Sequence, residues 1–113
     1  MVRYIKSANY DYYPFLDTKE YSNLLWFIKT EARRVGLVAK YYNDPDPNDL
    51  GGENRDRSNA VWIYDSDGNE IGEIIIQASK SDLSVDFEGD VEYFDSFQGA
   101  KNCIAQILES LAD

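Results

Sequence analysis

The sequence predicts an α+β fold: a two-layer sandwich in which an antiparallel β-meander has two helices packed on one face. Two observations predict this class. Apolar residues recur at helical spacing near both ends of the chain, in residues 18–35 and 96–111. Between these segments, short β-branched and aromatic runs are separated by turn residues, as the strands of a meander are. The length of 113 residues fits one domain, spanning residues 1–113.

The first helix is expected over residues 18–35. Asp17 or Thr18 can cap its start, and Glu20 stands three residues after Asp17, as in a capping box. Gly36 fits the left-handed position just past its end. The apolar face of this helix comprises Leu24, Phe27, Ile28, Ala32 and Val35.

Short strands are expected at residues 37–42 and at residues 2–6. Residues 43–58 then form a long polar loop with two prolines and two glycines. Loops longer than about 12–15 residues are uncommon in compact domains, and they are usually functional or disordered. The sequence leaves both alternatives open for this loop.

A β-hairpin is expected from residues 59–65 and 70–77, because the Ser-Asp-Gly-Asn turn between them is a strong hairpin signal. The next strand is expected near residues 82–93. Within it, Gly89 marks either a bulge or, as part of Glu-Gly-Asp, a tight turn that splits the strand in two.

The last helix is expected over residues 96–111. Asp95 and Gln98 have the spacing of a second capping box at its start. Its apolar face, which we expect to pack on the sheet, comprises Phe97, Ala100, Ile104, Ile107, Leu108 and Leu111.

The formal net charge of −10 is confined to the second half of the chain. Residues 1–60 contain nine acidic and nine basic residues, whereas residues 61–113 contain twelve acidic residues and two basic ones, Lys80 and Lys101. Because phosphate binding needs clustered Lys and Arg, we expect no direct nucleic-acid binding by that half. The imbalance favours either a basic protein partner or a role in solubility.

Enzymatic chemistry has little to build on in this sequence. There is no histidine, so the usual general base and metal ligand are missing, and one cysteine cannot form a zinc site. A calcium loop starting at Asp65 would need Gly at its sixth position and Glu at its twelfth, where Glu70 and Ile76 stand. Cys103 has no base to activate it and is expected to be a packed thiol. We therefore expect no catalytic residues, no metal and no cofactor.

The sequence also favours a cytoplasmic protein. No apolar run approaches the roughly 20 residues that span a bilayer, and the first residues lack the apolar core of a signal peptide. A lone cysteine suggests a reducing compartment.

Acidic residues recur on alternate positions in the segment DLSVDFEGDVEYFD, which begins at Asp82. Read as one strand, it has one apolar face and one face with five carboxylates. Together with the acids of the preceding hairpin, these give the expected partner-binding residues Asp82, Asp86, Glu88, Asp90, Glu92, Asp65, Asp67, Glu70 and Glu73. The alternative is a solvated sheet face that prevents aggregation through the sheet edge.

A second candidate interface consists of Tyr21, Leu25 and Trp26, which fall off the main apolar face of the first helix. Trp and Tyr are frequent anchors of protein interfaces. The alternative is that these side chains pack beneath the aromatic segment at residues 10–15.

The length, the lack of histidine and the acidic second half resemble small phage and mobile-element proteins of the anti-restriction or anti-CRISPR type. The resemblance implies an inhibitor that occupies a nucleic-acid-binding surface. The order helix, three strands, helix also resembles a double-stranded-RNA-binding domain, but the lysine-rich helix start of that family is absent, since SFQGAKN offers only Lys101.

Together these observations predict a non-enzymatic binding protein, an inhibitor that uses an acidic sheet face to occupy a basic, nucleic-acid-binding surface of a host protein. The alternative is a small structural or regulatory domain, compatible with a homodimer, whose acidity serves solubility.

Overall fold

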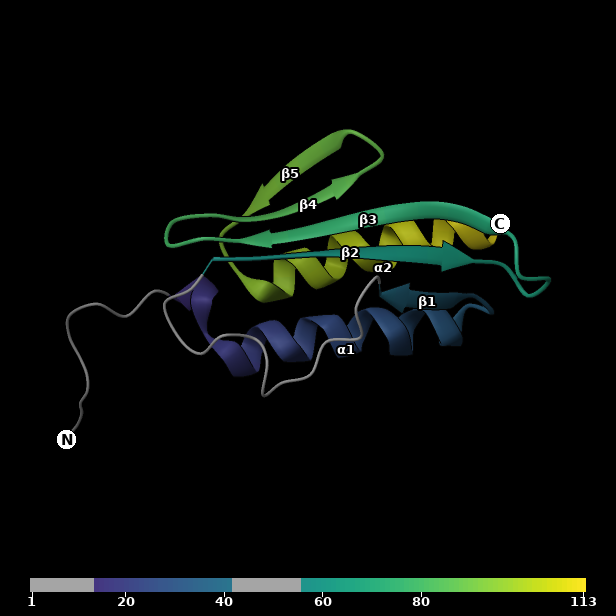
Figure 1. Ribbon diagram of the computed structural model, residues 1–113, viewed down its shortest axis with the longest axis horizontal. Coiled ribbons are helices and arrows are strands. Elements are labelled where there is room, and N and C mark those ends of the chain that lie inside the picture. The colour runs from purple at the N-terminus through teal and green to yellow at the C-terminus, as the bar shows by residue number, and fades with distance from the viewer. Residues whose placement is uncertain (1–13, 42–55) are drawn as a thin grey trace.

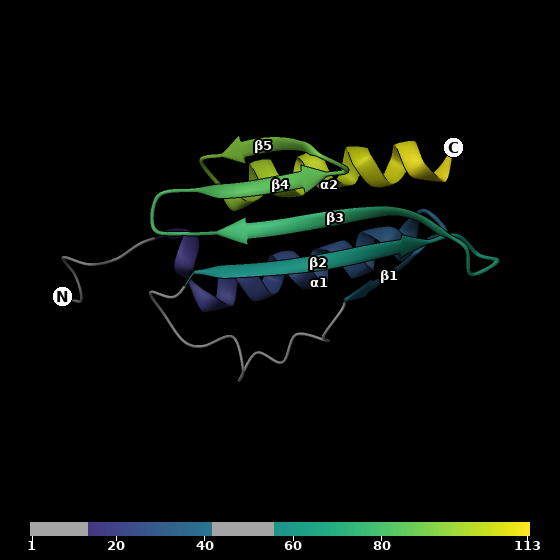
Figure 2. The ribbon, with the colours of Figure 1, turned by 45° about the horizontal axis from the view of Figure 1, so that its top comes forward.

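The computed structural model describes residues 14–41 and 56–113, and it has the predicted two-layer α+β architecture (Figure 1). Five antiparallel strands form one sheet in the order β1-β2-β3-β4-β5. The two helices, α1 (Thr18–Arg34) and α2 (Phe97–Ala112), both lie behind the sheet in Figure 2. The other face of the sheet, which we call the open face, has no helix of the described residues over it.

Helix α1 follows a 3-10 turn, Pro14–Leu16, and has the predicted ends. Asp17 is its N-cap, and its Oδ1 accepts a hydrogen bond from the backbone N–H of Glu20 at 3.0 Å. At the other end Gly36 is left-handed, with φ of 85°. The Leu37 N–H bonds the Ala32 carbonyl at 2.8 Å, which closes the helix in a Schellman motif.

The strands are β1 (Val38–Tyr41), β2 (Arg57–Tyr64), β3 (Glu70–Ala78), β4 (Leu83–Phe87) and β5 (Asp90–Phe94). Strand β2 therefore begins two residues before the expected residue 59, so Arg57 and Ser58 belong to the sheet and not to the polar loop. The rest of that loop and the strand expected at residues 2–6 lie largely or wholly outside the described residues.

The predicted β2–β3 hairpin is confirmed, with Gly68 at φ of 87° in its turn. The strand expected at residues 82–93 is two strands, as one of the two interpretations of Gly89 required. Glu88 and Gly89 have φ of 53° and 97°, the signature of a two-residue type I′ turn.

The core lies between the sheet and the helices. Val61, Ile63, Ile74 and Ile76 from the central strands are fully buried. From α2, Ile104 and Leu108 are fully buried, whereas Ile107 is half-buried at the edge of the contact. Ser96, rather than Asp95, caps α2, because its side chain accepts the Gly99 N–H at 3.0 Å. The Ser96 hydroxyl, one residue nearer the helix, thus takes the place of the capping box predicted at Asp95.

The start of α1 is held to the sheet by Arg57, which is 7% exposed. Its guanidinium donates to the Leu16 carbonyl at 2.6 Å and to Thr18 Oγ1 at 2.9 Å, and it lies 5.6 Å from the centre of the Tyr21 ring. The Tyr21 hydroxyl in turn donates to Asn59 Oδ1 at 2.7 Å. This buried polar cluster joins α1 to β2.

Replacing Arg57 with Met is expected to lower the free energy of unfolding by about 2–3 kcal/mol, because it leaves the buried Leu16 carbonyl without its charged donor. Urea unfolding followed by circular dichroism measures this loss. Arg33→Met, at an exposed position of α1, is the matched control and should change stability by less than about 0.5 kcal/mol. Equal effects of the two changes would contradict the role given to Arg57.

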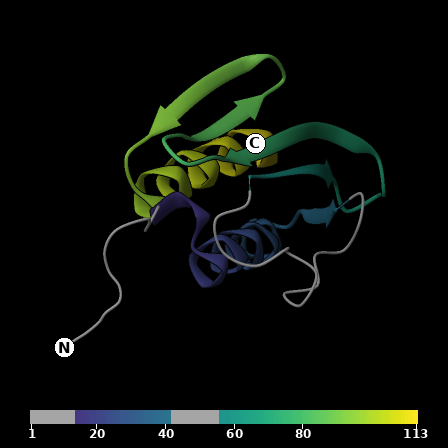
Figure 3. The ribbon, with the colours of Figure 1, turned by 60° about the vertical axis from the view of Figure 1, so that its left-hand side comes forward.

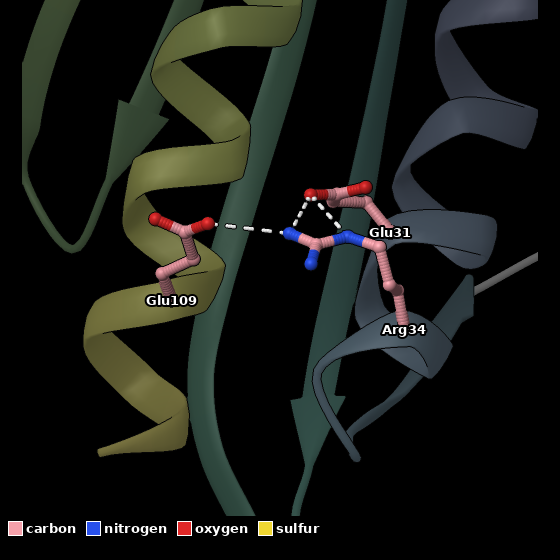
Figure 4. Close-up of polar contacts among 3 residues, drawn as sticks. All are labelled: Glu31, Arg34 and Glu109. Atoms are coloured by element: carbon pink, nitrogen blue, oxygen red, sulfur yellow. Dashed lines mark hydrogen bonds and ion pairs between the residues drawn. The ribbon is translucent and has the colours of Figure 1, made fainter.

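The far ends of the two helices are joined at the surface. Arg34 bonds Glu31 of its own helix at 2.5 Å and Glu109 of α2 at 3.2 Å (Figure 4). The hydrogen bond from Arg34 holds the pKa of the Glu31 carboxyl below its usual value. These exposed ion pairs contribute little to stability. The buried core, which includes Ile104 and Leu108, packs α2 beneath the β4–β5 hairpin.

Candidate protein-binding surface

The β4–β5 hairpin forms one edge of the sheet and lies over α2 (Figure 3). Its type I′ turn matches the right-handed twist of the two strands. Asp86 stabilises the turn, since its Oδ1 accepts the backbone N–H of Gly89 at 2.9 Å. Gly89 is needed there because a side chain is strained at its positive φ.

The turn corrects the expectation that five carboxylates share one face. Phe87 pairs with Asp90 and Val85 pairs with Glu92, so odd-numbered residues of β4 share a face with even-numbered residues of β5. The apolar side chains of β4 therefore point toward the helices, as do Asp90 and Glu92. Asp86 lies on the open face, opposite Ile75 and Val91.

Three of the predicted acids gather near α2. A groove of about 350 Å³ lies between the hairpin and this helix, lined by Val85, Phe87, Asp90, Glu92, Cys103, Gln106, Ile107 and Ser110. Glu88 Oε2 lies near its end, 3.5 Å from where a Cβ on Gly72 would stand. The groove thus has an apolar floor with carboxylates along one rim, and we call it the acidic groove.

The remaining predicted acids are dispersed and several have local structural roles. Asp65 Oδ1 accepts the backbone N–H groups of Asp67 and Asn69, each at 2.9 Å, and these bonds lower the pKa of its carboxyl. Glu73 accepts from the Trp62 indole N–H at 3.1 Å. Asp82 closes the β3–β4 turn, where its carbonyl accepts the Ser79 N–H at 2.8 Å. Asp67 and Glu70 are exposed at the β2–β3 turn.

Cys103 lies in the acidic groove and is half-buried. Its thiol donates a weak hydrogen bond to Glu92 Oε1, with sulfur and oxygen 3.4 Å apart. Burial and the neighbouring Glu92 carboxylate raise the pKa of the thiol to about 11. The group is therefore protonated at neutral pH and is a poor nucleophile.

Alkylation of Cys103 by iodoacetamide at pH 8 is expected to be at least about tenfold slower in the folded chain than in the same chain unfolded in urea. The reason is that the raised pKa keeps the folded thiol protonated until the pH rises toward about 11. Glu92→Gln removes one cause of the shift and should accelerate the reaction. Similar rates for folded and unfolded wild-type chain would contradict this description of the groove.

The open face is mixed: apolar and aromatic side chains lie among a few charged ones, without a row of acids. Opposing residues form rows across the sheet, among them Ala60–Ile75–Asp86–Val91 and Lys40–Trp62–Glu73. Val38, Val91 and Tyr93 of this face are 45%, 45% and 69% exposed. Sequence reasoning missed this surface, although the aromatic residues at alternate positions in β2 indicate it.

The aromatic cluster expected on α1 is divided by the structure. Tyr21 and Leu25 are buried in the core, at 0% and 1% exposed. Trp26 is 61% exposed, and the ammonium group of Lys29 lies 5.8 Å from the centre of one of its rings. Only Trp26 of these three side chains is available to a partner.

Among residues 14–41 and 56–113, no three acidic or cysteine side chains converge in a way that could hold a metal ion. None of the helices in these ranges is long and apolar enough to cross a membrane. Comparison of the chain with family models, with curated proteins and with solved structures found no match. The candidate surface is therefore defined by its own geometry.

Proposed function

We propose that this chain is a non-enzymatic binding protein, an inhibitor that uses the acidic β4–β5 hairpin to occupy a basic, nucleic-acid-binding surface of a host protein. The observation that carries the proposal is the acidic groove, where Asp90 and Glu92 line an apolar floor. Apolar area with charged groups at its rim is the usual anatomy of a protein interface.

The charge density of the hairpin sets what kind of mimicry is expected. Asp90 and Glu92 are two residues apart on one strand, so their side chains stand about 6.6–6.8 Å apart. That is twice the axial spacing of phosphates along one DNA strand, about 3.4 Å. The carboxylates alone therefore imitate nucleic acid sparsely, and the apolar floor must supply further binding energy.

Salt dependence tests the proposal. Affinity capture from lysate with the immobilised chain, followed by elution in steps of rising salt, is expected to release a basic protein early. Oppositely charged surfaces steer each other over about 8–10 Å at physiological ionic strength, and added salt shortens this range. Double-stranded DNA or RNA should compete for the captured protein. A partner that stays bound at high salt and is not displaced by nucleic acid would contradict the proposal.

A second candidate function is supported by the open face. Val38, Val91 and Tyr93 expose apolar surface there, and a homodimer that buried this face would make the chain a structural or regulatory domain whose acidity serves solubility. Sedimentation of the free chain distinguishes the candidates. A monomer at micromolar concentration is expected if the open face is not a self-interface.

A further inference from the structure

Within the described part of the chain, no strand pairs with the outer edge of β5. Strand β5 pairs with β4 alone among the described strands. Phe87 and Asp90 flank a two-residue turn, so they exchange both of their hydrogen bonds, and alternate residues along β5 repeat that orientation. Asp90, Glu92 and Phe94 therefore direct their N–H and C=O groups toward β4. Val91 and Tyr93 direct theirs outward, away from the sheet.

The two faces of β5 carry different chemistry. Asp90 and Glu92 point to the helix side, where they line the acidic groove. Val91 and Tyr93 lie on the open face and are 45% and 69% exposed. A strand added beside β5 would place its residues directly opposite these four, with side chains on the matching faces.

We propose that the outer edge of β5 binds an extended basic segment of a protein partner as a sixth strand. Its Lys or Arg side chains lie beside Asp90 and Glu92, and its alternate, apolar side chains lie beside Val91 and Tyr93. Backbone hydrogen bonds to Val91 and Tyr93 hold it in register. The inference rests on the proposed function, and it adds the binding mode and the sequence pattern of the partner.

Charge complementarity selects this occupant over a second copy of the chain. An antiparallel pair of β5 strands centred on Val91 or Glu92 would place carboxylates opposite carboxylates, which is destabilising. The net charge of −10 on each copy adds to the repulsion. Edge strands commonly use charged residues to prevent self-pairing in this way.

The probe is the peptide Lys-Val-Lys-Val-Lys-Val-Lys, with blocked ends and a fluorescent label, titrated with the full chain and followed by anisotropy. Its control is Lys-Lys-Val-Val-Val-Lys-Lys, which has the same composition and charge without the alternation. The alternating peptide is expected to bind at least about tenfold more tightly. Val91→Pro should abolish that difference, because it removes an outward N–H that β4 does not use, whereas Val91→Thr should keep it.

N-methylation of the peptide gives a second measurement that needs no change to the protein. Methylating the amides on one edge of the alternating peptide should block its binding, and methylating those on the other edge should not. Suppose that both isomeric peptides bind equally and that the double change Asp90→Asn with Glu92→Gln weakens both to the same extent. This result would overturn strand addition and leave the proposed function intact. If the double change leaves the affinity for both peptides unaltered, the result would count against the proposed function itself. Dimer formation abolished by Val91→Pro would overturn the inference in favour of a second copy.

Discussion

Replacing Ile104 with Asp is expected to leave the chain unfolded at room temperature. Ile104 is fully buried on α2 and belongs to the single core between the helices and the sheet. A carboxylate there would be desolvated in an apolar environment, which costs more than about 4 kcal/mol. Small domains have only about 5–15 kcal/mol of stability in total, so a loss of this size is enough to unfold a domain near the lower end of that range.

Thermal unfolding followed by circular dichroism tests this prediction, and the variant should show no cooperative transition. Asn102→Asp is the matched control, because Asn102 is exposed on the same helix and its oxygen accepts a hydrogen bond from Gln98, as a carboxylate also can. The control should unfold at a temperature close to that of the wild type. Ile107→Asp should have an intermediate effect, since that side chain is half-buried. A folded Ile104→Asp variant would mean that α2 does not pack as described.

Local signals in the sequence were sufficient for most of the fold. The Asp17 cap, the left-handed Gly36 and the Asp-Gly turn are all determined by residues within a few positions of each other, so α1 and the β2–β3 hairpin are where they were predicted. Helix α2 is also where its apolar periodicity predicted it, although Ser96 and not Asp95 is its cap. The end of the polar loop was less predictable. Arg57 reads as a loop residue, but its guanidinium is buried by partners some forty positions away.

The acidic surface was the harder part to predict, because a two-residue turn preserves alternation in the sequence while exchanging the faces in space. Val85 and Val91 are both odd-numbered and apolar, and they look like one face of one strand. The turn at Glu88 and Gly89 puts Val85 in the core and leaves Val91 45% exposed on the open face. Glu88 is a weak sequence signal for this turn, because non-glycine residues seldom adopt a positive φ.

The exchange of faces also changes which residues should carry binding. Asp86 stabilises the turn through Gly89, so replacing it would mix a structural effect with a binding effect. Among the predicted acids, Asp90 and Glu92 line the acidic groove and Glu88 lies near its end. They are the set whose charges can be removed with the least effect on the hairpin.

The combined change Glu88→Gln, Asp90→Asn and Glu92→Gln is expected to weaken binding to the basic partner at least about tenfold at low salt. Most of the loss should appear as a slower association rate, because it removes the charges that steer encounter. Folding should be preserved, since exposed charges contribute little to stability and like-charge repulsion is relieved. Surface plasmon resonance at several salt concentrations separates the two rates.

A matched control has the same change in net charge at exposed positions outside the groove lining: Glu20→Gln, Asp56→Asn and Asp67→Asn. If the acidic groove is the interface, this control should associate nearly as fast as the wild type, because charges more than about 8–10 Å from the contact are screened at physiological ionic strength. Equal losses in the two triple variants would show that net charge alone attracts the partner. If the groove variant binds as tightly as the wild type, the interface is better sought on the open face around Trp62 and Tyr93. Contacts made by these aromatic side chains would depend little on salt concentration.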